Sequence, residues 1–248
     1  MQSRLEATGQ QSAFTSLIEY KYTEESVFKE FIFMEKIYFA LVDTPGLFAS
    51  MIRKTIGISY VHVAIGLDAD LKEAYSIGRR NPFIPVVAGF EQEHLAAIYS
   101  AFPTARYKVV SLECTGWQKA AIAAQLEECF ENRFRYHYCV LGLPFLLMNI
   151  PFYQKRHYTC SSFIARLLAD NGIDLFGKHF SLVTPRDFYE LPQTEFVYEG
   201  TLEGFLSKEP DGYDFSQWES LYESKKHLQH RPVFGINVPH FLYNLSRK

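Results

Sequence analysis

The residue with the clearest capacity for chemistry is Cys160, which lies in the stretch Tyr158-Thr159-Cys160-Ser161-Ser162. Apolar residues follow at helical spacing, namely Phe163, Ile164, Leu167 and Leu168. Thr159 suits the N-cap of this predicted helix, and Asn171-Gly172 suits its end. Cys160 is therefore expected in the first helical turn, where unpaired N–H groups and the helix dipole favour a thiolate over a thiol.

A nucleophilic cysteine needs a base and a group that holds the base. The alternating run 60–67 predicts a strand on which His62 shares one face with Ala64 and Gly66, so another element has room to approach the ring. The return strand, predicted over 72–77, carries Glu73 as the candidate that orients the imidazole. The simplest hairpin register sets Glu73 opposite Gly66, so a bulge or shear would be needed to bring it to the ring. Asp68 is the alternative acceptor.

Together, Cys160, His62 and Glu73 predict acyl transfer from an amide or ester. The imidazole would stabilise the thiolate, the carboxylate would fix the ring, and the Cys160 N–H would help to bind an oxyanion. The residues alone also fit a structural interpretation. A strand histidine is commonly a satisfied structural residue, and a free cysteine packs well as a small hydrophobe.

Composition excludes several other classes of protein. The chain has 248 residues, is 48% hydrophobic and carries a formal net charge of −3, which gives no sign of a nucleic-acid partner. The four cysteines form no CxxC pair, so no metal site and no cofactor are predicted. The sequence VDTPGL at 42–47 resembles a GTPase switch, but the GxxxxGK[ST] phosphate loop that must precede it is missing.

The chain is predicted to be soluble and cytoplasmic. Its start lacks the charged and apolar regions of a secretory signal. The longest apolar run, 139–153, is too short to span a bilayer and is interrupted by Pro144 and Pro151. A core helix is the favoured interpretation of this run, and an interfacial segment is the alternative.

The remaining pattern predicts an α+β domain. Further strands are expected over 36–42, 106–112 and 195–199, and further helices over 47–56 and 117–130. Because strands come early and late with helices between them, α+β is favoured over alternating βαβ units. We expect a peripheral segment over 1–35, a catalytic domain over 36–202 and an extension over 203–248 that packs on it.

Two stretches resemble a known superfamily: TPGLFASMIRKTIGISYVHVAIGLD with KEAYSIG, and HYTCSSFIARLLADNGI with SLVTPRDFYEL. They are similar to the circularly permuted branch of the NlpC-type papain-like superfamily, which includes YiiX-like bacterial proteins and, more distantly, lecithin–retinol acyltransferases. The resemblance spans about residues 36–200. In the permuted order the histidine strand precedes the cysteine helix, as it does here.

The resemblance implies a permuted papain-like fold, with a small antiparallel sheet packed against the cysteine helix. It implies His62 as base, Cys160 as nucleophile and Glu73 in the polar third position, where related families also use histidine. The implied function is a cysteine hydrolase acting on amide bonds in peptide or cell-wall fragments. A thiol acyltransferase or lipid esterase is the second enzyme class, and a non-catalytic binding module is the alternative outside enzymes.

Three further residues are predicted to contact a substrate. Tyr158, just before the nucleophile, would line the oxyanion site or a pocket, although a packing role fits it equally well. Arg79 and Arg80 lie in a basic loop that would meet an anionic group, with a solvated loop as the alternative. The partner is expected to be a peptide, amide or acyl-lipid substrate, and the sequence does not specify an oligomeric state.

Overall fold

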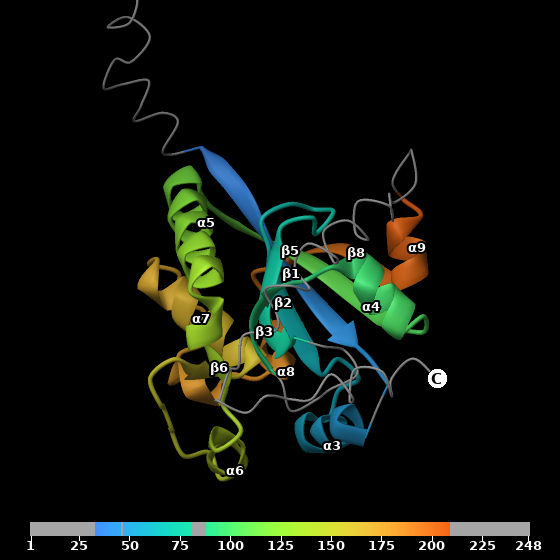
Figure 1. Cartoon of the computed structure of the whole chain (residues 1–248). Helices are drawn as coiled ribbons and strands as arrows, with labels where there is room; N and C mark the ends of the chain where they lie inside the picture. Colours follow the sequence, from blue (N-terminus) through green and yellow to red (C-terminus); the bar gives the residue numbers. More distant parts are fainter. Residues whose placement is uncertain (1–32, 46, 81–87, 209–248) are drawn as a thin grey trace, which may run out of the picture.

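The protein is described here from a computed structural model, which places residues 33–45, 47–80 and 88–208. These residues form an α+β structure around one eight-stranded sheet, mostly antiparallel, with the order β7-β6-β4-β3-β2-β1-β5-β8 (Figure 1). The strands are β1 (Met34–Asp43), β2 (His62–Gly66), β3 (Ala74–Arg79), β4 (Ala88–Gln92), β5 (Arg106–Thr115), β6 (His137–Tyr138), β7 (His157–Tyr158) and β8 (Glu195–Thr201). The predicted α+β class is confirmed, and the sheet is larger than expected.

Seven α-helices accompany the sheet in the described part of the chain. They are α3 (Leu47–Ile56), α4 (Leu95–Ala101), α5 (Gly116–Glu131), α6 (Gly142–Leu147), α7 (Cys160–Asp170), α8 (Pro185–Tyr189) and α9 (Leu202–Leu206). Short 3₁₀ turns lie at η1 (Arg133–Arg135) and η2 (Phe180–Leu182). None of the helices in the described ranges is long and apolar enough to cross a membrane.

The sheet separates two apolar cores (Figure 1). Helices α5 and α7 cover one face, where Ile122 and Ile164 pack with Val63 of β2. Helices α4 and α9 cover the other face, where Leu95 and Phe205 join a cluster that includes the alternate residues of β1 and β2. Alternate residues of the central strands therefore contribute to opposite cores, and both faces of these strands are buried.

Helix α7 begins and ends where its sequence predicts. The Thr159 side chain accepts a hydrogen bond from the Ser162 N–H at 3.2 Å, and Ser162 Oγ accepts one from the Thr159 N–H at 2.8 Å. This reciprocal capping box satisfies two N-terminal donors. Asn171 caps the other end, and Gly172 follows with φ +75°, a conformation that favours glycine. Cys160 is therefore the first residue of the helix.

The hairpin register of β2 and β3 differs by one residue from the simplest prediction. Ile65 pairs with Tyr75 and Gly66 pairs with Ala74, so Glu73 is placed opposite Leu67, and its carbonyl accepts from the Leu67 N–H at 2.9 Å. A shift of one residue moves every side chain of a strand to the opposite face. Glu73 is therefore on the opposite side from His62 in the strand alternation.

Candidate active site

The sheet and α7 bring the predicted nucleophile and base together. His62 is the first residue of β2, and Cys160 is the first residue of α7. The Cys160 thiol and the His62 imidazole interact through a hydrogen bond and through charge. Residues nearly a hundred positions apart in the chain thus form the contact that a thiolate–imidazolium pair requires.

A local break in strand pairing admits the helix end to the sheet. Within the described residues, β2 pairs with β3 only at Ile65 and Gly66, at the end of the strand away from His62. The backbone N–H of Val63, just inside the unpaired end, donates to the Cys160 sulfur. The Ser161 N–H, in the first turn of α7, also donates to it. Two backbone donors therefore stabilise negative charge on the sulfur in addition to the imidazole.

The group that holds the imidazole is Glu93, immediately after β4. Its Oε1 lies 2.8 Å from His62 Nε2. Ser76 of β3 donates its hydroxyl to the same oxygen, and the Glu93 N–H donates to the Ala74 carbonyl at 2.8 Å. Because Nε2 is committed to Glu93, Nδ1 is the ring nitrogen left to face the sulfur. The order Cys–His–Glu is that of a nucleophile, a base and a group orienting the base.

The prediction of Glu73 in this third position is corrected by the structure. Glu73 is exposed, and the register described above turns it to the side opposite His62. Asp68, the alternative acceptor, is committed to its own loop. Its carboxylate accepts the backbone N–H groups of Asp70, Lys72 and Glu73 at 2.8–3.0 Å. Such a loop-capping carboxylate fixes the turn between β2 and β3.

The electrostatics of the three groups support an ion pair. Burial alone would raise the pKa of the Cys160 thiol, but the charge and hydrogen bond of His62, with the two backbone N–H groups, lower it. Burial opposes the charged form of His62, but the Cys160 thiolate and the Glu93 carboxylate raise its pKa to about 10. Burial likewise opposes the charge of Glu93, and His62 and Ser76 lower its pKa.

A tyrosine that the sequence did not single out interacts with the thiol. Burial raises the pKa of Tyr138 in β6, and the negative charge of Cys160 raises it further. The guanidinium of Arg79 acts in the opposite direction on the same hydroxyl. The Tyr138 hydroxyl therefore stays protonated beside the charge of Cys160.

The predicted substrate residues separate into different roles. Tyr158 packs edge-on against Phe163, with ring centroids 5.6 Å apart, and its hydroxyl lies 3.1 Å from that of Tyr153. These are the contacts of a packing tyrosine, and Tyr138 is the tyrosine that interacts with Cys160. Arg79 lies over the ring of Phe102, with its guanidinium carbon 5.7 Å from the centroid.

Arg80 is corrected to a structural residue. Its side chain is 8% exposed, and Nη2 donates to the Arg133 carbonyl at 2.7 Å. Nε lies 3.5 Å from Glu91, and the guanidinium lies over Phe134. A guanidinium committed in this way anchors η1 to the sheet and leaves little surface for an anionic substrate. The rest of the predicted basic loop, 81–82, lies outside the described residues.

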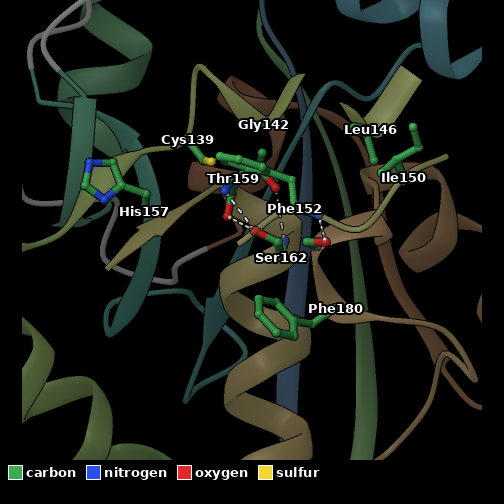
Figure 2. A pocket seen from close by; sticks show the side chains of 10 residues that line it. Cys139, Gly142, Leu146, Ile150, Phe152, His157, Thr159, Ser162 and Phe180 are labelled. Atoms are coloured by element: carbon green, nitrogen blue, oxygen red, sulfur yellow. Dashed lines mark hydrogen bonds between the residues drawn. The ribbon is translucent and has the colours of Figure 1, made fainter. Parts of the chain in front are cut away.

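A hollow opens beside the first turn of α7 (Figure 2). It is small, with room for about one water molecule. Thr159 and Ser162 line it from the helix, and Cys139, Phe152 and Phe180 line it from the neighbouring segments. Cys160 is not among the lining residues, so its thiol does not line this hollow.

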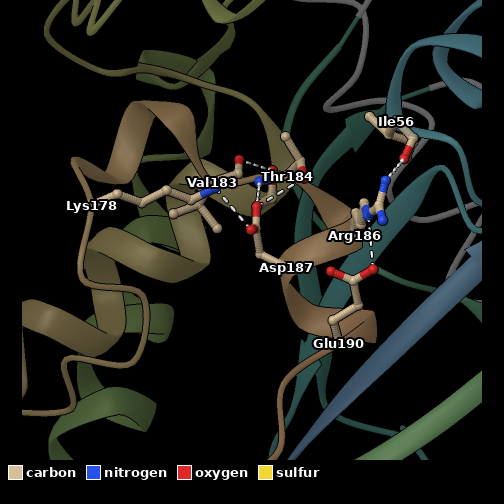
Figure 3. Close-up of polar contacts among 8 residues, drawn as sticks. Ile56, Lys178, Val183, Thr184, Arg186, Asp187 and Glu190 are labelled. Carbon is tan, nitrogen blue, oxygen red and sulfur yellow. Dashed lines mark hydrogen bonds and ion pairs between the residues drawn. The ribbon is translucent and has the colours of Figure 1, made fainter. Parts of the chain in front are cut away.

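The far side of α7 is anchored by the turn that follows η2. Ser161 Oγ donates to the Val183 carbonyl at 2.6 Å. Thr184 then caps α8 through Asp187, whose carboxylate accepts the Thr184 N–H at 2.7 Å and also pairs with Lys178 (Figure 3). These contacts give this turn a structural role. They fix the helix end and with it the sulfur position.

Comparison of the chain with protein-family models, with curated proteins and with solved structures found no match. The likeness to the permuted papain-like superfamily therefore depends on the motifs quoted above.

Two residues of the candidate site, Glu93 and Tyr138, were not predicted from the sequence because both belong to elements with weak signals. Strand β4 has five residues, two of them polar, and β6 has only two. The alternation of Phe90 with Glu91 and Glu93 was the available sign that a strand precedes an acidic residue on a buried face.

Proposed function

We propose that the protein is a cysteine-dependent acyl-transfer enzyme, with an amide as the substrate class and hydrolysis as the outcome. The observation that carries the proposal is the partly buried chain Cys160–His62–Glu93, in which each group shifts its neighbour's pKa toward the charged form. We propose with it that the fold is papain-like and circularly permuted, supported by the histidine strand preceding the cysteine helix.

In the first step the Cys160 thiolate attacks the acyl carbon and forms a thioester. The His62 imidazolium gives its proton to the leaving amine as the C–N bond breaks. The oxyanion of the tetrahedral intermediate would accept hydrogen bonds from the Cys160 N–H and from the Tyr138 hydroxyl. Glu93 keeps the ring oriented with Nε2 protonated throughout.

In the second step water attacks the thioester. Neutral His62 takes a proton from the water, and the thioester C–S bond breaks to release a carboxylic acid and restore the thiolate. If the enzyme is an acyltransferase, an alcohol or amine takes the place of water in this second step. A lipid ester as the acyl donor is the second candidate, favoured by the exposed apolar side chains around α6.

The experiment is alkylation of the full chain with iodoacetamide near pH 6, followed by peptide mapping. Cys114, Cys129 and Cys139 serve as internal controls, because burial raises the pKa of each thiol. We expect Cys160 to react at least about tenfold faster than these three, because the lowered pKa of its thiol gives it the larger thiolate fraction. Equal reactivity of all four thiols would leave only a binding module with this fold.

The substrate class is tested with acyl-amides, peptidoglycan fragments and phospholipids, each analysed by mass spectrometry. We expect product and an acyl adduct on Cys160 from at least one class, and neither from Cys160→Ala. Release of amine identifies the amidase, and release of a lysolipid identifies the lipid-cleaving alternative. A reactive Cys160 that turns over none of these would disprove both assignments.

A further inference from the structure

The segment around α6 exposes an unusual amount of apolar surface. We define the α6 patch by six side chains that are between 47% and 67% exposed: Val140, Leu141, Leu147, Met148, Ile150 and Tyr153. No residue of α6 itself is buried. The interpretation of 139–153 as a core helix is thus wrong. A contiguous apolar surface of this kind marks an interaction site.

Contacts of Phe145 and Phe152 hold the segment that carries the α6 patch in place. Phe145 of α6 stacks on Phe152 with ring centroids 4.7 Å apart, and the Phe152 N–H donates to Ser181 Oγ at 3.2 Å. Leu146 of α6 and Ile150 of the patch line this side of the hollow beside α7 (Figure 2). Because these contacts fix the inward side of the segment, the side chains of the α6 patch on its other side are left exposed to solvent.

The sequence around the patch carries basic side chains and no carboxylates, although two of its five basic side chains, Arg133 and Arg166, pair with Glu91 and Asp170. Between Asn132 and Ala169 the sequence contains no aspartate or glutamate. It contains five basic side chains, namely Arg133, Arg135, Lys155, Arg156 and Arg166. Arg135 and Lys155, which flank the apolar segment on either side, are exposed. The chain as a whole has a formal net charge of −3, whereas the net charge of this stretch is positive.

We propose that the α6 patch docks onto an anionic lipid surface. The apolar side chains would enter the interfacial layer, and the flanking cations would meet the lipid phosphates. Helix α6 lies at one end of the molecule, away from α4 and α9, so a flat bilayer can approach it (Figure 1). The absence of carboxylates in this stretch favours an anionic surface over a protein rim of mixed charge.

The docked orientation brings the hollow beside α7 to the bilayer surface, since α6 forms one of its walls. The proposal concerns binding and does not depend on the thiol. Cys160→Ala should therefore bind vesicles as well as the unaltered chain does, whatever becomes of the proposed function.

The test is sedimentation of the full chain with vesicles. One set is phosphatidylcholine alone, and the other is equimolar phosphatidylcholine and phosphatidylglycerol. We expect strong binding to the anionic vesicles and weak binding to the neutral ones. Binding should fall when salt rises from about 0.1 M to about 1 M, because the Debye length shrinks from about 10 to about 3 Å.

The matched variants are Leu147→Glu and Phe196→Glu. These side chains are 64% and 67% exposed, and Phe196 is on the distant edge strand β8. Leu147→Glu should lower the partition coefficient about tenfold or more, since it places a carboxylate at the contact. Phe196→Glu should stay within about twofold. Lys155→Gln should weaken binding to the anionic vesicles, and Lys72→Gln, far along the chain, should not.

Three results would overturn the proposal. The first is no sedimentation with either vesicle. The second is binding that Leu147→Glu leaves unchanged. The third is a concentration-dependent dimer, measured by light scattering without lipid, that Leu147→Glu abolishes while vesicles bind neither form. That last outcome would assign the α6 patch to a second copy of the chain.

Discussion

Cys129 and Cys160 are equally buried, each 4% exposed, and both pack into the core between the sheet and its two helices. Their pKa values shift in opposite directions. Burial raises the pKa of Cys129, in the last turn of α5, against a hydrogen bond from Tyr136. His62 and two backbone donors reverse the effect of burial at Cys160 in the first turn of α7.

Burial and activation of a thiol are separate effects in this protein. Desolvation acts on both thiols and disfavours the thiolate in each. Cys160 differs in its neighbours: an imidazolium, and N–H groups that point toward the sulfur. Cys129 has a phenol and a nearby carboxylate, Glu128, which opposes a second negative charge. The position on the helix and the partner, and not the degree of burial, decide which thiol has a lowered pKa.

The substitution His62→Ala should remove the difference in pKa between the two thiols. Without the imidazolium, desolvation should dominate at Cys160 as it does at Cys129. We expect the alkylation rate of Cys160 at pH 7 to fall about 30-fold or more, since an unperturbed thiol is only a few per cent ionised there. Peptide-resolved alkylation measures it, with Cys129 in the same sample as the control. A Cys160 rate that stays high would show that the helix end alone activates the thiol.

A second pair of variants distinguishes the two glutamates. Glu93→Gln keeps the shape but removes the charge that orients and charges His62, so the Cys160 rate should fall about tenfold. Glu73→Gln alters an exposed side chain and should change the rate by less than about twofold. Both rates come from the same alkylation assay, with thermal unfolding as a check on folding. Equal effects of the two changes would contradict the observed register.

The pH dependence should differ between the two thiols. As pH falls through the lowered pKa of Cys160, the thiolate is protonated and its alkylation slows, and this decline should occur at lower pH than for an ordinary thiol. The rate of Cys129 should keep rising above pH 9 because its pKa is raised. Turnover should decline as pH rises through about 10, where His62 loses the proton it gives to the leaving group. A single shared profile for both thiols would refute the ion pair.

The smallest effect is expected from Gly78→Ala. A Cβ at this position would lie 3.3 Å from His62 Cε1 and 3.0 Å from Ser76 Oγ, both closer than ordinary contact. The ring and the Ser76–Glu93 hydrogen bond must shift by a few tenths of an ångström. We expect the Cys160 rate to fall about two- to fivefold, since orientation of the base is what suffers. An unchanged rate with intact folding would show that the ring tolerates displacement.

The local elements of the site were predictable from the sequence. The N-cap Thr159, the stop at Asn171-Gly172 and the apolar spacing between them placed Cys160 in a first turn, as the structure shows. Alternation around His62 predicted its strand. Capping and periodicity act within a few residues, so a single sequence carries them in full.

The third residue was not predictable in the same way. The choice between Glu73 and Glu93 depends on a hairpin register that Asp68 sets by capping three loop amides, and on pairing with the short strand β4. A one-residue change in register reverses the faces of a strand, and no local pattern in 72–77 reports it. Tyr138 reaches the thiol only because the two-residue strand β6 joins the far edge of the sheet.

For the 139–153 segment, too, the sequence predicted one part of the result and the tertiary structure decided the other. Its apolar composition was plain from the sequence and predicted either a core helix or an interfacial one. Only the tertiary structure left Leu141, Leu147 and Met148 exposed, because the cores of the sheet are already filled by α4, α5, α7 and α9. The sequence by itself determined which residues could do chemistry, since that depends on residue type and helix position. The tertiary structure decided which carboxylate holds the base and which apolar residues meet solvent, since both depend on contacts between distant segments.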